Sequence, residues 1–229
     1  MQPSESNHET IEPQYQGLLD ADRAHGRMQL GLMSSETWRY DPKRLTFVLS
    51  RYKFAAQMLR GLDFVVEFGC ADAFGSRIVR QAVGNLTVSD FDPILLSDAA
   101  ECGDSVFSMT YRHHDLLSGP LLGPFGGALA LDVLEHIDPA SEHIFLSNLS
   151  NSLTKDGVAV IGMPSLESQR YASAYSRAGH VNCQTGEQLR TTLSAHFSHV
   201  FMFSMNDEVV HTGFLPMAHY LLALCVNPQ

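Results

Sequence analysis

The feature that most constrains the fold is an alternation of short apolar segments with helix-length segments from residue 62 onward. The apolar segments are rich in β-branched and aromatic residues, as in DFVVEFG, LTVSD, ALALDVL and GVAVIGMP. Segments with helical character, roughly ten to fifteen residues long, separate them, which is typical of βαβ units. We therefore predict a parallel sheet with helices on both faces.

The end of the chain separates two variants of this architecture. The segments HVFMFSM and HYLLALCV both have strand character, and no helix-length segment lies between them. We predict a final antiparallel strand pair at the sheet edge. A nicotinamide-binding Rossmann domain is expected to continue with strand–helix–strand crossovers instead, so this ending argues against an NAD-dependent oxidoreductase.

The residues before this alternation form two further segments. Residues 1–14 are polar and acidic, and we predict a disordered tail there. Residues 15–61 have helical character and predict an N-terminal helical cover on the α/β domain of residues 62–229.

Two helices are expected within the cover, over residues 15–35 and 42–60. In the second, apolar residues recur at three- and four-residue spacing. Asp41 and Pro42 mark its start as a capping residue and a first-turn proline, and Gly61 marks its end.

Charge and cysteine content exclude several classes of function. The chain has 15 basic and 25 acidic side chains and a net charge of −10. This charge disfavours binding to nucleic acid or to an anionic membrane surface. Its four cysteines include no CxxC pair, which argues against a structural zinc site and a disulfide scaffold. The N-terminus does not resemble a signal peptide, and no apolar run is long enough to span a bilayer. We expect a cytoplasmic protein.

Carboxylates follow four of the predicted strands. The first strand is followed by small residues from Gly69 onward, which let a ligand approach the strand end and the next helix N-terminus. About twenty residues later, the second strand ends in a carboxylate that is placed to accept both hydroxyls of a ribose. The carboxylates at the four strand ends are Glu67, Asp90, Asp115 and Asp132.

At these residues the sequence resembles the class I S-adenosylmethionine-dependent methyltransferases. VVEFGCADAFGS matches the glycine-rich first motif of that family, SDFDP its ribose-acid motif, and HHDLLSG its adenine-side motif. ALDVLEHIDP followed by LTKDGVAVIGMPS is similar to the ubiquinone-pathway O-methyltransferase branch. The resemblance covers residues 62–226.

The resemblance implies a Rossmann-like, mostly parallel sheet of seven strands in the order 3-2-1-4-5-7-6, with strand 7 antiparallel. It implies S-adenosyl-L-methionine as cofactor and methyl transfer to a small-molecule acceptor, with oxygen favoured by the ubiquinone-type motifs. A nitrogen acceptor and a non-catalytic S-adenosylmethionine-binding partner subunit are the alternatives. We expect no nucleic-acid or membrane partner, and a homodimer is left open.

The resemblance also implies roles for individual residues. Glu67 orders the first loop, and Asp90 accepts the ribose hydroxyls. Asp115 binds the adenine amino group, with a loop cap as the alternative role. The backbone of Leu116 contacts the adenine ring, and Asp132 borders the methionine end. The complete set of implied cofactor-binding residues is Glu67, Gly69, Cys70, Ala71, Asp90, Phe91, Asp115, Leu116 and Asp132.

The first motif departs from the family pattern, which has three alternating glycines. Gly69 matches the first of them, but Ala71 and Ala73 occupy the next two positions. Alanine fits where φ is negative, but its Cβ narrows the room beside the methionine moiety of the cofactor. The two alanines also keep the non-catalytic alternative open.

Asp90 has a competitor two residues away. Asp92 precedes Pro93, a pattern that predicts a helix N-cap. We therefore assign the ribose to Asp90, which lies at the strand end itself.

Two histidines are candidates for the catalytic base, because the ordinary imidazole pKa suits proton transfer near neutral pH. His136 follows the fourth strand, where the acceptor would approach the methyl group, and it equally fits a role in shaping that loop. His180 lies in a polar insertion over residues 164–184, where an ordinary loop position is the alternative.

We predict no metal site. His113 and His114 are adjacent on a strand, so their side chains point to opposite faces and cannot chelate one ion together. His196 and His199 straddle a helix end. In the N-terminal helices, Arg51 and Lys53 are candidates for holding an acidic acceptor, with solvated side chains as the alternative.

Overall fold

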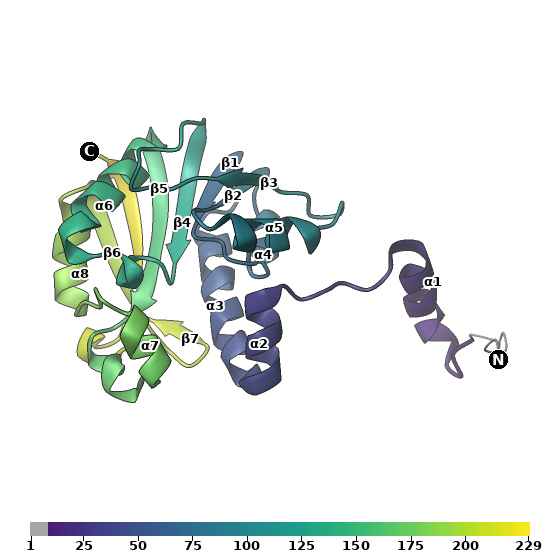
Figure 1. Cartoon of the computed structure of the whole chain (residues 1–229). Coiled ribbons are helices and arrows are strands. Elements are labelled where there is room, and N and C mark those ends of the chain that lie inside the picture. Colours follow the sequence, from purple (N-terminus) through teal and green to yellow (C-terminus); the bar gives the residue numbers. More distant parts are fainter. Residues whose placement is uncertain (1–8) are drawn as a thin grey trace.

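The computed structural model describes residues 9–229, and a single mixed sheet organises this part of the chain (Figure 1). The sheet has eight strands among the described residues, in the order β3-β2-β1-β4-β5-β8-β6-β7. The strands are β1 (Phe64–Phe68), β2 (Asn85–Asp90), β3 (Thr110–His113), β4 (Phe125–Leu131), β5 (Leu153–Pro164), β6 (Phe197–Asn206), β7 (Val209–His211) and β8 (Tyr220–Pro228).

The strand order confirms the predicted Rossmann-like topology. β1 to β5 pair in parallel, whereas β8 lies antiparallel between β5 and β6. β6 and β8 are thus the predicted antiparallel pair, with β8 inside the sheet. The sequence pattern did not predict β7, a three-residue strand that pairs with the end of β6 at the sheet edge.

Helices cover both faces of the sheet (Figure 1). α6 and α8 pack on one face, and α3, α4 and α5 on the other. The helices are α1 (Gln16–His25), α2 (Leu32–Tyr40), α3 (Pro42–Met58), α4 (Ser76–Arg80), α5 (Pro93–Glu101), α6 (Glu142–Asn151), α7 (Ala174–Gly179) and α8 (Gly186–Ser194).

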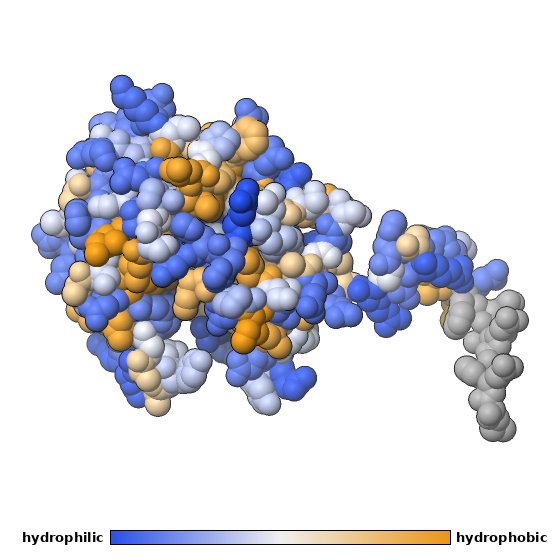
Figure 2. All heavy atoms as spheres, turned by 45° about the horizontal axis from the view of Figure 1, so that its top comes forward, coloured by the Kyte–Doolittle hydropathy of each residue, from blue (hydrophilic) through white to orange (hydrophobic). Residues whose placement is uncertain are grey.

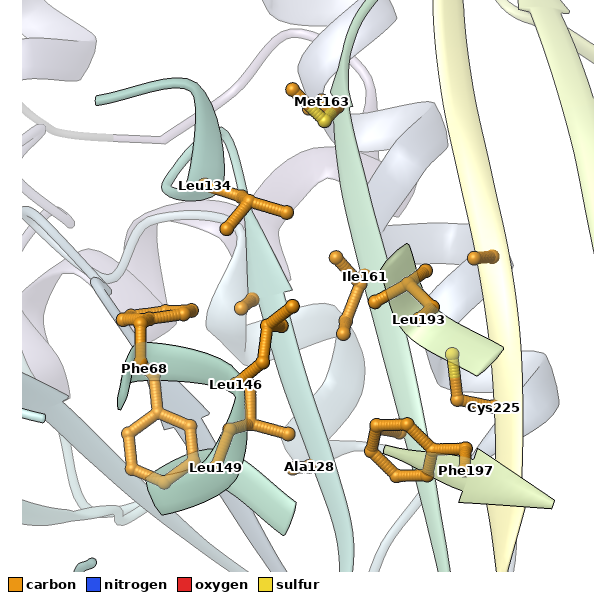
Figure 3. Packing of buried hydrophobic residues seen from close by; sticks show 14 of the residues in the cluster. Phe68, Ala128, Leu134, Leu146, Leu149, Ile161, Met163, Leu193, Phe197 and Cys225 are labelled. Carbon is orange, nitrogen blue, oxygen red and sulfur yellow. The ribbon is translucent and has the colours of Figure 1, made fainter. Parts of the chain in front are cut away.

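The core is divided between these two faces. Val65 and Val66 are adjacent on β1, are both fully buried, and belong to different hydrophobic clusters, because side chains alternate across a strand. Figure 3 shows the cluster beneath α6 and α8, where Leu193 lies beside Ile161 of β5 and Leu146 lies over β4. A central strand buried on both sides explains the nearly continuous apolar sequence of β1.

The N-terminal region differs from the expected pair of helices. The single helix predicted over residues 15–35 is wrong, because α1 and α2 are separate and residues 26–31 between them are not helical. Gly26 ends α1 with a φ of +71°, a conformation that glycine adopts at little cost. Gly31 precedes α2, and a Cβ there would lie 2.3 Å from the Cβ of Asp72.

The segments around this break have different environments. Within the described residues, α1 buries no side chain and projects from the sheet domain (Figures 1 and 2). α3 begins at Pro42 as predicted, although Asp41 makes no side-chain capping bond. The predicted tail over residues 1–14 lies largely outside the described residues, and the three-segment division stays a prediction.

No helix within residues 9–229 combines the length and the apolar character needed to cross a bilayer.

Candidate active site

The carboxyl ends of β1, β2 and β4 meet at the centre of the sheet. From β1, the chain adds β2 and β3 on one side of the sheet and then crosses to add β4 and β5 on the other side of β1. In open α/β sheets, ligands bind outside the strand ends at such a topological switch point. The predicted site residues that follow these strands are therefore brought to one edge of the sheet.

Gly69 turns the chain sharply after β1. Its φ is +74°, and a Cβ there would lie 2.4 Å from Cγ2 of Val133. The amides of Gly69 and Cys70 donate to the carbonyl oxygen of Ser89 on β2, at 2.8 and 3.1 Å. Both the backbone conformation and the close approach of Val133 therefore require glycine here.

Neither alanine of this loop has the negative φ that suits a residue with a Cβ. Ala71 has a φ of +48° and Ala73 a φ of +52°, which is the left-handed region that costs a residue with a Cβ about 1–2 kcal/mol. The loop therefore follows a path that glycine adopts more readily. The strain belongs to the segment that is predicted to hold the cofactor.

Asp90 holds this strained loop against the end of β2. Its Oδ2 accepts the backbone amide of Ala71 at 2.9 Å, and its Oδ1 accepts the amide of Asp92 at 2.9 Å. Asp92 in turn accepts the amide of Ile94 at 2.8 Å and caps α5, which confirms the predicted helix cap. Phe91, between the two aspartates, exposes 70% of its surface.

The end of β3 lies beside Asp90. The amide of His114 donates to the Asp90 carbonyl at 3.0 Å. Asp115 accepts the amide of Leu117 at 2.9 Å, and Leu116 is buried with its carbonyl bonded to the side-chain amide of Asn148 at 2.7 Å. The structure thus brings the two predicted adenine-side residues to the same edge as Asp90.

Glu67 lies below the loop and is almost completely buried. Its Oε1 accepts the hydroxyl of Tyr52 on α3 at 2.7 Å. Burial raises the pKa of Glu67 to about 7, and the neighbouring carboxylates of Asp90 and Asp72 raise it further, against the hydrogen bonds that lower it. Burial also raises the pKa of Tyr52 well above its ordinary value.

Asp132, at the end of β4, pairs with Arg51 of α3. Nη1 of Arg51 lies 2.8 and 2.6 Å from the two carboxylate oxygens of Asp132. The guanidinium lies over the ring of Tyr220, 3.7 Å from its centroid, and the Tyr220 hydroxyl accepts the amide of Asp132 at 3.2 Å. Among the described residues, the buried Nε of Arg51 has no hydrogen-bond partner.

A second contact joins the N-terminal helices to the loop after β1 and to α5. The amide of Ser34 donates to Oδ2 of Asp72 at 2.6 Å, and the amide of Leu32 donates to Oδ2 of Asp98 at 2.7 Å. Two carboxylates from the sheet domain therefore bind the first turn of α2, where a helix has unsatisfied N–H groups.

The insertion after β5 is held against the end of β4. The amides of Val181 and Asn182 donate to the backbone carbonyl of Glu135, at 2.8 and 3.0 Å. This contact brings His180 next to His136, with 5.2 Å between the ring centroids. The two predicted catalytic histidines thus lie together, although 44 residues separate them in the sequence.

The two rings are oriented through their Nδ1 atoms. Nδ1 of His136 is 2.9 Å from the carbonyl oxygen of Gly179, and Nδ1 of His180 is 3.0 Å from Oε1 of Gln169. Burial lowers the pKa of His180, and its neighbour His136 lowers it further. His180 is therefore held in its neutral form more readily than a free histidine.

Glu135 follows the fourth strand between Asp132 and His136, and the sequence alone gave it no individual role. It is fully buried, and neither carboxyl oxygen has a hydrogen-bond partner among residues 9–229. Burial raises the pKa of Glu135 well above its ordinary value, and the charge of Asp132 acts in the same direction. Nε2 of His136 lies 4.0 Å from its Oε1.

The remaining histidines lie elsewhere. Nε2 of His113 contacts the Phe91 carbonyl and Nε2 of His114 contacts the Gly119 carbonyl, both at 2.9 Å, so they face different neighbours as predicted. His196 lies beside His143, with 4.9 Å between ring centroids.

Comparison with known proteins finds similarity in structure but not in sequence. No family model and no curated protein sequence matches this chain. The N-methyltransferase NodS from Bradyrhizobium japonicum WM9, in complex with S-adenosyl-L-homocysteine, superposes with a TM-score of 0.59 at 20% identity. The alignment covers 84% of this chain and 92% of NodS.

Two further methyltransferases with bound S-adenosyl-L-homocysteine are similar. Magnesium protoporphyrin IX methyltransferase from Synechocystis PCC 6803 has a TM-score of 0.57 at 16% identity, over 92% of this chain and 94% of that one. The plantazolicin methyltransferase BpumL has a TM-score of 0.63 at 13% identity, over 86% and 89%. The chain therefore has the Rossmann-like fold of the class I S-adenosylmethionine-dependent methyltransferases.

Proposed function

We propose that this protein is an S-adenosylmethionine-dependent methyltransferase that acts on a hydroxyl of a small molecule. The observation that carries the proposal is the position of Asp90, which joins the end of β2 to the Gly69 loop at the switch point of the sheet. The neighbours that share this fold include enzymes crystallised with the demethylated cofactor. The oxygen acceptor rests on the ubiquinone-type motifs.

The residues present fit this cofactor. S-adenosyl-L-methionine carries a ribose diol, an adenine and a zwitterionic methionine. Asp90 offers carboxylate oxygens for the diol, and Asp115 lies beside it for the adenine amino group. Arg51 is a buried cation whose Nε has no partner among the described residues, and a methionine carboxylate is a suitable acceptor for that N–H.

When bound, the cofactor supplies an electrophilic methyl group on a sulfonium. The protein then has to orient the acceptor and exclude water, and orientation alone can contribute roughly 7–11 kcal/mol to such a reaction. The contact of His136 Nδ1 with the Gly179 carbonyl favours a proton on Nδ1, which leaves the Nε2 lone pair free to take the acceptor proton. A positioned base of this kind typically contributes about 10²–10⁴-fold.

Two alternatives each have a specific observation. NodS is described as an N-methyltransferase, so nitrogen is the second acceptor atom to test. The positive φ values of Ala71 and Ala73 favour the non-catalytic partner subunit. Their Cβ atoms narrow the space beside the cofactor at loop positions that are usually glycine. The cytoplasmic location and the homodimer stay predictions.

The test is isothermal titration with S-adenosylmethionine, S-adenosylhomocysteine and NAD. We expect both sulfur nucleotides to bind and NAD not to bind. Asp90→Ala should abolish binding, because the ribose loses its acceptor and the Ala71 amide loses its bond. Asp92→Ala is the matched control, since it removes only the cap of α5 and should leave the affinity unchanged.

Turnover then separates enzyme from binding module. Formation of S-adenosylhomocysteine with a pool of hydroxylated metabolites is expected, and amines serve as the comparison. Binding of NAD alone, or equal nucleotide affinity in Asp90→Ala and wild type, would overturn the proposal.

A further inference from the structure

The buried carboxyl group of Glu135 has no explanation within the chain. Its side chain is 1% exposed, and both of its oxygens are unpartnered among the described residues. A buried polar group without a partner costs free energy, and such groups are rare in folded proteins. Its neighbour Arg51 does not pair with it, because the guanidinium is bonded to Asp132.

The two histidines beside Glu135 make the same kind of contact through Nδ1. Each has its Nδ1 within 3.0 Å of a neutral oxygen acceptor, the Gly179 carbonyl for His136 and the Gln169 side-chain oxygen for His180. An Nδ1–H donated to such an oxygen leaves the lone pair on Nε2. This arrangement is characteristic of histidines that ligate a metal, where the outer hydrogen bond fixes tautomer and ring direction.

The distances suit a single ion. One ligand atom each from Glu135, His136 and His180 can be chosen so that all lie within 4.8 Å of one another. Two ligand atoms that bind one tetrahedral ion at about 2.1 Å lie about 3.4 Å apart. On binding, the Glu135–His136 separation of 4.0 Å would shorten by about 0.6 Å, and no other separation in the group by more than about 1.4 Å.

We propose that Glu135, His136 and His180 bind one divalent first-row transition-metal ion. Two imidazoles and one carboxylate suit zinc, manganese, iron or cobalt, whereas magnesium and calcium prefer sites made of oxygen ligands. The positive charge of the ion would compensate the negative charge of the buried Glu135 carboxylate. His136 exposes 48% of its side chain, so the site is open to solvent on one side and keeps positions for a further ligand.

The role of the ion rests on the proposed function. An acceptor hydroxyl bound to the metal becomes more acidic, as metal-bound water does. Its O–H bond breaks and the proton leaves to solvent. An oxygen electron pair then forms the new bond to the methyl carbon, while the carbon–sulfur bond breaks and its electrons stay on sulfur. In the loaded enzyme the metal would replace His136 as the means of activating the acceptor.

The experiment is a titration of tag-free, chelator-treated protein with Co²⁺ alone, followed by its visible d–d absorption, and with Zn²⁺ by calorimetry. We expect one ion per chain with micromolar affinity. Glu135→Gln keeps the size of the side chain and removes its charge, and should weaken binding by more than about tenfold, as should His180→Gln.

His143→Gln is the matched control, because the His143–His196 pair has similar ring spacing but belongs to no three-ligand group found among residues 9–229. This variant should bind Co²⁺ as tightly as wild type. Equal loss in all three variants, no Co²⁺ absorption in the wild type, or binding of Mg²⁺ with no Co²⁺ or Zn²⁺ response would overturn the site.

A measurement on the unmodified chain covers the case in which Glu135→Gln does not fold. Substoichiometric Mn²⁺ should broaden the ring NMR signals of His136 and His180 but not those of His143. Calorimetry with S-adenosylhomocysteine is run in parallel. Nucleotide binding without metal binding would refute the ion alone, and metal binding without nucleotide binding would refute the proposed methyltransferase.

Discussion

The two halves of the candidate site differ in how their polar side chains are satisfied. In the cofactor half, at the ends of β1 and β2, Glu67, Asp72 and Asp90 each accept at least one hydrogen bond from the chain. In the acceptor half, at the end of β4 and the insertion, Glu135 accepts none among the described residues, and His136 and His180 face it.

The difference shows which half depends on a ligand for its stability. The carboxylates of the cofactor half already hold the loop and α2 in place, so this half is organised before a nucleotide binds. In the acceptor half, the two Glu135 oxygens have no hydrogen-bond partner among the described residues and gain one only when a ligand binds. We therefore expect substitutions in the cofactor half to change the free energy of unfolding of the free protein. Substitutions of Glu135, His136 and His180 should mainly change ligand affinity.

The largest expected effect concerns pH and Glu67. Its pKa is about 7 when folded against an ordinary value of 4.5, so the folded protein holds this proton at pH values where the unfolded chain has lost it. The contribution is therefore fully present below about pH 4.5 and is lost as pH rises through 7, amounting to roughly 3 kcal/mol at most.

Urea unfolding between pH 5 and pH 8 measures this contribution. The stability of the wild type should decrease with pH in that range, and Glu67→Gln should flatten the curve. Glu101→Gln, on the exposed end of α5, should keep the wild-type slope. A Glu67→Gln curve parallel to that of the wild type would show that Glu67 is ionised in the fold.

The ion pair between Arg51 of α3 and Asp132 at the end of β4 should give the next largest effect. Arg51→Met leaves Asp132 without its partner, and the cost should be about 2 kcal/mol. This lies below the range for fully buried pairs because Asp132 exposes 35% of its side chain. Asp132→Asn should cost a similar amount, and the double variant less than the sum of the two.

Denaturant unfolding of the four proteins in this cycle gives the coupling energy. Lys53→Met, two residues along α3 and exposed, is the control and should have little effect. Additive single effects would mean that the pair contributes nothing to the free protein.

The smallest expected effect concerns the two alanines of the cofactor loop. Ala71→Gly and Ala73→Gly should each stabilise the free protein by up to about 1 kcal/mol, because relief of the left-handed strain exceeds the entropy that glycine adds to the unfolded chain. The same exchange in a helix, Ala99→Gly in α5, should destabilise by about 1 kcal/mol.

Thermal unfolding compares the three glycine variants. Destabilisation by Ala71→Gly equal to that of Ala99→Gly would contradict a positive φ at Ala71. An increase in nucleotide affinity along with stability would show that the alanines also narrow the loop around the cofactor.

The parts that were predictable from sequence depend on local pattern. Strand–helix alternation predicted the sheet. The Asp92–Pro93 pair predicted the cap of α5, because the capping side chain and the amide that it accepts are only two residues apart in the sequence. The break at residues 26–31 was missed, since helical spacing of apolar residues continues through it while Gly26 and the contact of Gly31 with Asp72 interrupt the helix.

By itself, the sequence determined the order of the elements and the placement of carboxylates at the ends of successive parallel strands, since both follow from periodicity along the chain. Only the tertiary structure decided the pairing of Arg51 with Asp132, the left-handed backbone at Ala71, and the meeting of Glu135 with His180. Each of these depends on a contact between segments distant in sequence or on a dihedral angle that packing imposes, and neither leaves a periodic signal in the chain.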